Sequence, residues 1–228
     1  MAHRFTRAPL TAVLAALVAA APLGAQWQGV INFHGQRGAD DGQGSDIEYV
    51  EGPGGMAKMN MQHSEGGPVS VIFDKNKNTA TIVMTARKMY MTMPMDRAQA
   101  EAQQQMAKSK ITDTGKSEVV AGHKCEIFHA SDAEDSTETD ACIASDMGTF
   151  ATFQAPGSEG HGGAETMLSK VKQFFGAKGG FFPLKVTTYK NSKLEETFVA
   201  TSIEAKSVPA SEFAPPAGFT AMPGPGQL

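Results

Sequence analysis

The stretch Thr79–Met95 constrains the fold of this chain most strongly, because its side chains alternate in character. In its second half, methionine occupies every second position: Met89, Met91, Met93 and Met95. Successive side chains of an extended chain point to opposite faces, so this spacing gathers the four thioethers on one face, whereas a helix would scatter them. The first half places Ala80, Ile82 and Met84 on one face in the same way. The stretch therefore predicts two neighbouring strands with a soft apolar face, the first at Thr79–Met84.

Short alternating segments bounded by Gly, Pro, Asn and Asp recur along most of the chain. They predict further strands at Gln28–Gln36, Asp46–Glu51, Met56–His63, Val69–Phe73, Ser117–Val120, Lys124–Ala130, Glu138–Ala144, Phe182–Tyr189 and Leu194–Ile203. In the third of these, every second residue again shares a face: Ala57, Met59, Met61 and His63. Turn signals of this density favour an antiparallel meander over alternating βαβ units. The chain is therefore expected to be mainly β, in the α+β class.

Two segments have helical character instead. Asp96 can cap a helix over Arg97–Lys110, which is rich in Ala, Gln and Glu but carries only a thin apolar stripe. We expect this helix at the surface, as a lid. Ala164–Phe175 has apolar residues at helical spacing and ends before Gly176, so a second, amphipathic helix is predicted there.

The first 25 residues have the parts of a secretory signal peptide: a basic start, an apolar run at Leu10–Ala21 and small residues at Leu23–Ala25. The apolar run is too short to span a bilayer. Gln26 rather than cysteine follows, so no lipid attachment is expected. We expect a periplasmic or secreted protein with a signal peptide at 1–25, a single domain at 26–220 and a flexible Gly/Pro tail at 221–228.

The charge and the cysteine content limit the partners and the covalent links that this protein can have. The net charge of −4 argues against nucleic acid as a partner, because phosphate binding needs clustered Lys and Arg. Cys125 and Cys142 are the only cysteines, and an exported protein meets an oxidising environment. A disulfide between them would stabilise the fold by about 3 kcal/mol, and we favour it over metal ligation or free thiols.

The sequence carries no recognisable catalytic motif. Gly-x-Ser-x-Gly, His-Glu-x-x-His, Gly-x-Gly-x-x-Gly and the P-loop pattern are all absent. The histidines beyond the signal segment are isolated in or beside strands or in a loop: His34, His63, His123, His129 and His161. His123 and Cys125 resemble half of a metal site, although Cys142 offers the simpler partner for Cys125. We predict neither enzyme activity nor a cofactor.

The order of several short motifs resembles one known family. These motifs are Met56-Ala-Lys-Met-Asn-Met, Val71-Ile-Phe-Asp-Lys, Lys88-Met-Tyr-Met, Val120-Ala-Gly-His-Lys-Cys-Glu-Ile-Phe, Phe182-Pro-Leu-Lys-Val and Val208-Pro-Ala-Ser-Glu-Phe. The family is the bacterial exported domain of unknown function 4412, which is similar in architecture to the periplasmic lipoprotein carrier. The resemblance implies a single, strongly curved antiparallel sheet, a half-barrel of the LolA/LppX type, with two or three helices covering its concave side. It implies no catalytic residues, because none are defined for the family.

The first functional hypothesis is a non-enzymatic binding protein for a lipid or another apolar ligand. Methionine is unbranched and polarisable, so it suits surfaces that fit irregular apolar partners. The residues expected to line the cavity are Met59, Met61, Met84, Met89, Met91, Met93, Phe174 and Phe175.

Copper handling in the cell envelope is the alternative, because thioethers are soft ligands that suit Cu(I). The Met-x-Met spacing gives a candidate ligand set of Met59, Met61, His63, Met89, Met91 and Met93. A second alternative is a structural protein whose methionine-rich core holds no ligand. Protein partners are not predicted, and no later segment is apolar enough to form a transmembrane helix.

Overall fold

The computed structural model describes residues 27–38, 44–63, 67–96, 110–132, 136–148, 150 and 181–224. Within these ranges the chain forms one sheet of twelve strands. The first six are β1 (Gly29–Arg37), β2 (Gly44–Glu51), β3 (Met56–His63), β4 (Gly67–Asp74), β5 (Thr79–Met84) and β6 (Met89–Pro94). The others are β7 (Lys110–Val120), β8 (His123–Asp132), β9 (Thr137–Ala144), β10 (Phe182–Lys190), β11 (Lys193–Ala205) and β12 (Thr220–Met222).

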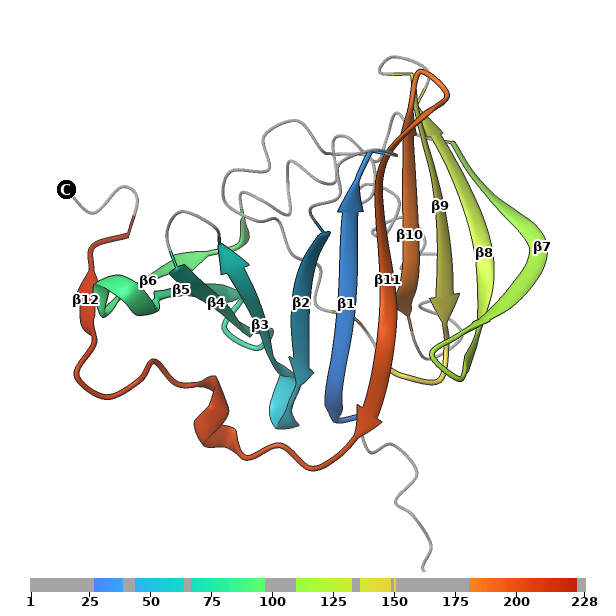
Figure 1. Cartoon of the computed structure of the whole chain (residues 1–228). Coiled ribbons are helices and arrows are strands. Elements are labelled where there is room, and N and C mark those ends of the chain that lie inside the picture. Colours follow the sequence, from blue (N-terminus) through green and yellow to red (C-terminus); the bar gives the residue numbers. More distant parts are fainter. Residues whose placement is uncertain are drawn as a thin grey trace, which may run out of the picture.

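The strand order is β12-β6-β5-β4-β3-β2-β1-β11-β10-β9-β8-β7. Two antiparallel meanders, β1–β6 and β7–β11, are joined side by side where β1 pairs with β11. The sheet is strongly curved and unclosed, with β12 and β7 at its ends (Figure 1). Every pairing is antiparallel except that of β12 with β6. The prediction of one curved, mainly β, antiparallel sheet is confirmed.

The predicted strands correspond closely to the observed ones. Met56–His63 and Thr79–Met84 agree at both ends, and most others differ by one or two residues. The largest difference is β7, which was predicted from Ser117 but begins at Lys110. The register shifts between Asp113 and Lys116, and Gly115 there has φ +67°. The glycine therefore lies in a β-bulge within one strand and does not mark the start of a new strand, and placing Lys110 in a helix was wrong.

The predicted helices lie mainly outside the described residues, which exclude 97–109 and 151–180. The helical elements with bounds inside the described ranges are three short 3-10 turns: η1 (Pro53–Gly55), η2 (Thr85–Arg87) and η3 (Ala210–Phe213). Residues 1–26, which include the signal peptide expected at 1–25, are outside the description as well. The first two residues of the expected tail, Ala221 and Met222, belong to β12.

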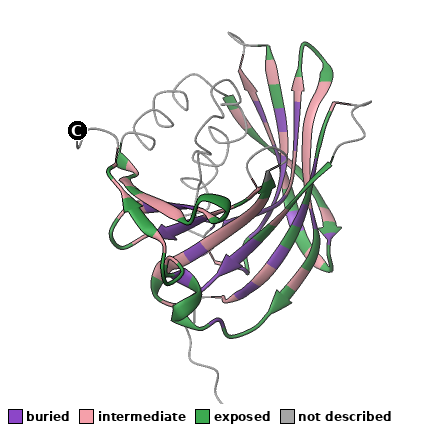
Figure 2. Cartoon of the chain, turned by 60° about the vertical axis from the view of Figure 1, so that its left-hand side comes forward, coloured by how far each residue is buried: buried purple, intermediate pink, exposed green. Residues whose placement is uncertain are grey.

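Buried residues alternate with more exposed ones along the strands of the curved sheet (Figure 2). The contacts within the main apolar core place it on the concave face. Tyr49 on β2 and Phe182 on β10 have ring centroids 5.5 Å apart, although β1 and β11 lie between their strands. Neighbouring strands are about 4.8 Å apart, so three steps separate the two backbones by about 14 Å on a flat sheet. Their contact shows that side chains on this face converge, as they do on the inside of a bend.

Register shifts occur where the two halves of the sheet join and within the β7–β11 half. They interrupt β1 against β11, β9 against β10, β10 against β11, and β7 against β8. Extra residues of this kind bend and twist a strand. In the described strands from β1 to β6 the pairing continues without a shift, so side chains of that half form straight rows across the sheet.

A second apolar cluster lies on the convex face of that half. Val50, Ile72 and Val83 on β2, β4 and β5 are covered by Val208 and Phe213. The covering residues belong to the C-terminal strap, residues 206–219, which runs from β11 past η3 to β12 at the edge of the sheet (Figure 1). Both faces of the β2–β6 half are therefore apolar, but only the concave face carries the alternating methionines.

Candidate ligand-binding site

Alternation in β3, β5 and β6 collects the thioethers on the concave face. We use the name methionine face for Met59, Met61, Met84, Met89, Met91, Met93 and Met95. All of them except Met89 pack against the main core cluster, and Met89 lies directly opposite Met84 in the β5–β6 register. The prediction that Ala80, Ile82 and Met84 share a face is confirmed, since all three belong to that cluster.

The strand register arranges this face in rows. One row crosses β2 to β6 as Tyr49, Met59, Val71, Ile82 and Met91. The next row contains Ile47, Met61, Val69, Met84 and Met89. Side chains directly opposite one another on adjacent strands are in contact distance, so each row is a continuous apolar strip.

Burial within the rows is graded. Tyr49 is 0% and Val71 1% exposed, whereas every member of the methionine face is half-buried. In the row of Tyr49, the short aliphatic side chains therefore form a packed floor, and the longer thioether chains rest on it with part of their surface accessible. A solid core would bury these methionines fully, and an ordinary solvent face would not place them against buried Val and Ile.

Three aromatic rings occupy the centre of the concave face. The ring centroids of Tyr49 and Phe150 are 4.8 Å apart, and those of Phe150 and Phe182 are 5.0 Å apart. Tilted and edge-on contacts of this kind are favourable for aromatic pairs. Sequence reasoning missed this trio. Phe150 lies outside any periodic segment, and no local pattern indicates that β2 and β10 approach each other.

A buried polar network lies beside this trio. Glu51, 2% exposed, accepts a hydrogen bond from the Tyr49 hydroxyl and forms an ion pair with Lys75, whose Nζ is 2.7 Å from a carboxylate oxygen. Lys75 comes from the β4–β5 turn, where its backbone N–H donates to the Gly55 carbonyl. A charge so deeply buried requires such partners. The network fixes the β4–β5 turn against the end of β2.

The β4–β5 turn is itself held by Asp74. Its carboxylate accepts hydrogen bonds from the backbone N–H groups of Asn76 and Lys77, and Lys77 Nζ lies 3.0 Å from it. The hydrogen bond from the Lys77 side chain is the largest of the interactions that lower the pKa of Asp74. The turn that supplies Lys75 is thus stabilised by a local Asx-type arrangement.

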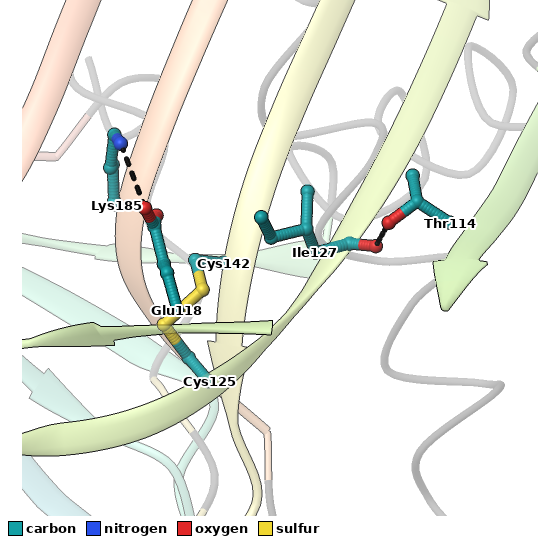
Figure 3. Close-up of a disulfide and its surroundings, with 6 residues drawn as sticks. All are labelled: Thr114, Glu118, Cys125, Ile127, Cys142 and Lys185. Atoms are coloured by element: carbon teal, nitrogen blue, oxygen red, sulfur yellow. Dashed lines mark hydrogen bonds and ion pairs between the residues drawn. A yellow bond between two sulfur atoms is a disulfide. The ribbon is translucent and has the colours of Figure 1, made fainter. Parts of the chain in front are cut away.

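The predicted disulfide is confirmed: Cys125 on β8 is bonded to Cys142 on β9 (Figure 3). Both residues are buried, and their Cα atoms are 5.2 Å apart. Glu118 on β7 lies beside them and forms an ion pair of 3.2 Å with Lys185. Among the described residues, these two cysteines and Glu118 form the one group of acidic, His or Cys side chains close enough to suggest a metal site. The disulfide makes both sulfurs unavailable as thiolate ligands.

The remaining candidate residues are placed as follows. Phe174 and Phe175 lie outside the described residues, so their expected approach to the methionines stays a prediction. His63 ends β3, opposite Gly67, and only its backbone is described. In the copper ligand set, Met89 and Met91 are near neighbours on β6, whereas Met59 and Met61 lie three strands away on β3.

The other histidines have aspartate partners. His34 Nδ1 is 2.8 Å from Asp46, and His129 Nδ1 is 2.8 Å from Asp140, each pair joining adjacent strands. His161 lies outside the described ranges. Among the described residues, no helix is long and apolar enough to cross a membrane.

An unclosed, strongly curved antiparallel sheet with an apolar concave face defines the β half-barrel class. The chain belongs to the family described as Domain of unknown function (DUF4412), whose profile matches residues 29–219. None of the curated proteins compared with the sequence matches it. The family expectation is therefore confirmed over most of the chain.

Several solved structures are similar in fold. The chain resembles the structure of the MucA/MucB complex of Pseudomonas aeruginosa with a TM-score of 0.50 and 12% identity, over 84% of this chain and 56% of that one. PNGF-II gives a TM-score of 0.47 and 10% identity, over 86% of this chain and 31% of that one. A LolA superfamily protein of Nitrosomonas europaea gives a TM-score of 0.37 and 6% identity, over 84% of this chain and 91% of that one. The chain thus spans less than two thirds of the MucB and PNGF-II chains.

Proposed function

We propose that this protein is a non-enzymatic binding protein that holds a lipid or another apolar ligand against the methionine face. The observation that carries the proposal is the half-burial of seven thioethers on the concave face of the β3–β6 segment of the sheet. Flexible thioether chains over a rigid aliphatic floor can adapt to acyl chains of varied shape. The buried acid of this face, Glu51, already has Lys75 and Tyr49 as partners, which suits a structural role rather than a catalytic one.

Export is part of the proposal. The segment at 1–25 has the composition of a signal peptide, and the Cys125–Cys142 disulfide suits an oxidising compartment. We therefore place the protein in the periplasm or outside the cell, where an apolar ligand needs a carrier to pass through water.

The test is binding of cis-parinaric acid, a fluorescent acyl chain, to the purified protein. Met91→Lys should weaken binding at least about tenfold, because a charge on this apolar face is poorly tolerated. Thr92→Lys is the matched control, since Thr92 is the exposed neighbour on the opposite face. It should bind like the unmodified protein, although the Thr81–Thr92 hydrogen bond is lost.

A second variant separates loss of binding from loss of folding. Met91→Gln is uncharged and similar in length, so it should fold, as judged by circular dichroism, and still bind more weakly than the Thr92→Lys control. Absence of saturable binding by the unmodified protein would end the proposal. Equal binding by the Met91 and Thr92 variants would move the ligand away from the methionine face.

Cu(I) binding is the second candidate, and the β5–β6 register favours it. Met84 lies opposite Met89, and Met91 follows on the same face, so three half-buried thioethers gather at one corner. Soft thioether ligands suit Cu(I). Titration with Cu(I) under reducing conditions tests this reading. Binding that is lost in Met84→Leu but kept in Met56→Leu supports it, and affinity no higher than that of a methionine-poor control protein excludes it.

A further inference from the structure

The methionine face holds most of the accessible sulfur in the described part of this protein, the other half-buried thioethers being those of Met56 and Met222. The chain has two cysteines, and both are consumed in the buried disulfide. Oxidants that would otherwise react first with a thiol therefore meet thioethers instead. Methionine is the other side chain whose sulfur is readily oxidised, and its sulfoxide can be reduced again by dedicated reductases.

Burial divides the methionines sharply. Each member of the methionine face is half-buried, and so are Met56 on the convex face and Met222 on β12, whereas Met147 is only 2% exposed. Since oxidation requires approach of the oxidant to sulfur, this division predicts a strong preference among side chains of identical chemistry. Met147 is thus a built-in reference for a protected thioether.

We propose that the methionine face is a modification site for two-electron oxidants, peroxides or hypochlorous acid, and that its oxidation releases the bound ligand. With a hydroperoxide, a sulfur lone pair attacks the terminal oxygen and the O–O bond breaks. The departing oxygen leaves as hydroxide from hydrogen peroxide or as alkoxide from an organic hydroperoxide. It takes up the proton of the transferred oxygen to give water or alcohol, and a sulfoxide S=O bond remains. Sulfur is oxidised by two electrons, and the peroxide is reduced by two.

The side chains around these sulfurs explain why sulfoxide formation would weaken ligand binding. Met91 lies between Ile82 on β5 and Met222 on β12, and Val71 follows Ile82 in the same row. None of these side chains can donate a hydrogen bond to a sulfoxide oxygen. The Tyr49 hydroxyl in that row already donates to Glu51. A sulfoxide here turns its oxygen toward the accessible side, so the fold is kept while the surface that meets the ligand becomes polar. The release of ligand rests on the proposed function; the oxidation preference does not.

Peptide mapping by mass spectrometry after graded exposure to hydrogen peroxide tests the site itself. The same protein unfolded in guanidinium gives the intrinsic rate at each position. We expect the methionine face to gain oxygen at rates close to those of the unfolded chain, and Met147 to react at least about tenfold more slowly in the folded protein. Equal protection of the methionine face and Met147 would overturn the proposal.

A binding assay tests the consequence. The variant M56L/M106L/M167L/M222L removes methionines at positions not assigned to the methionine face, including Met222, which lies opposite Met91. It should bind cis-parinaric acid like the unmodified protein, lose binding on oxidation, and regain it after treatment with methionine sulfoxide reductases and dithiothreitol. Oxidised protein that retains full binding would overturn the ligand-release step while leaving the proposed function intact. If the unoxidised protein fails to bind, the proposed function fails, and the oxidation map is judged on its own.

Discussion

At the residue scale, the methionines and the side chains beneath them have different tasks. Met91 lies opposite Ile82, and Met93 lies opposite Ala80. The aliphatic partners are nearly inaccessible, at 9% and 7%, while the methionines keep part of their surface. A branched side chain in place of methionine would have fewer conformations with which to follow a ligand. A local alternation pattern cannot reveal this pairing of a short buried residue with a long half-buried one, because it does not fix the register between neighbouring strands.

The buried carboxylate of Glu51 should contribute more to stability than any exposed ion pair. Glu51→Ala leaves Lys75 and the Tyr49 hydroxyl without this partner, and we expect a loss of about 3 kcal/mol, at the low end for a broken buried pair since Lys75 still reaches water. Urea unfolding followed by circular dichroism measures this loss of unfolding free energy. Lys77→Ala, which removes an exposed partner, should cost less than about 1 kcal/mol. Comparable losses for the two variants would contradict this assignment.

Asp74 should make stability depend on acid. Hydrogen bonds from Lys77 lower the pKa of this carboxyl below its usual 3.8, so the folded state favours the ionised form. Its stabilisation is fully present at pH above 3.8 and is lost as the pH falls through the lower pKa of the folded state. The difference in unfolding free energy between the unmodified protein and Asp74→Asn should therefore shrink as the pH falls below 3.8. A difference that does not change with pH would refute the contribution.

At the element scale, the two end strands protect the sheet in different ways. β12 covers β6 with three residues in parallel pairing. In β7, the Asp113 carboxylate accepts from the Gly115 N–H, and the Thr114 hydroxyl accepts from the Lys116 N–H. These side chains satisfy backbone donors at the bulge that could otherwise pair with another chain, which is a common device against edge-to-edge association.

The C-terminal strap depends on one close approach. A Cβ added at Gly52 would lie 2.1 Å from the Phe213 ring, so only glycine lets the strap reach the convex face there. Gly52→Ala should displace the ring, and Phe213→Ala should cost about 3 kcal/mol as a buried aromatic is lost. In the double variant, Gly52→Ala should add little to the cost of Phe213→Ala, because the clash is gone. Additive losses in urea unfolding would show that the two residues act independently.

Most elements could be predicted from sequence, because alternation and turn residues are local signals. Thr79–Met84 and Met56–His63 were located to the residue. β12 could not be predicted, since its three residues pair with β6 only through the path of the C-terminal strap. β7 was predicted too short because glycine has the same signature in a bulge and in a turn.

At the scale of the whole molecule, curvature creates the site. The register shifts lie in the pairings between and beyond β1 and β11, and the regular β2–β6 half carries the thioether rows. Contacts such as Tyr49 with Phe150 and Phe182 arise only once the two halves face each other. The methionine spacing therefore predicted which side chains share a face, whereas the aromatic trio required knowledge of how the sheet bends.

The central claim is that an apolar ligand contacts the methionine face, and methyl NMR of the protein labelled at the methionine methyl carbons tests it most directly. Each signal is assigned by single Met→Leu substitution, and oleic acid is then titrated in. We predict that the signals of Met59, Met84, Met91 and Met93 shift together and saturably, while those of buried Met147 and convex-face Met56 stay in place. Unchanged signals throughout, or shifts confined to methionines away from this face, would contradict the account.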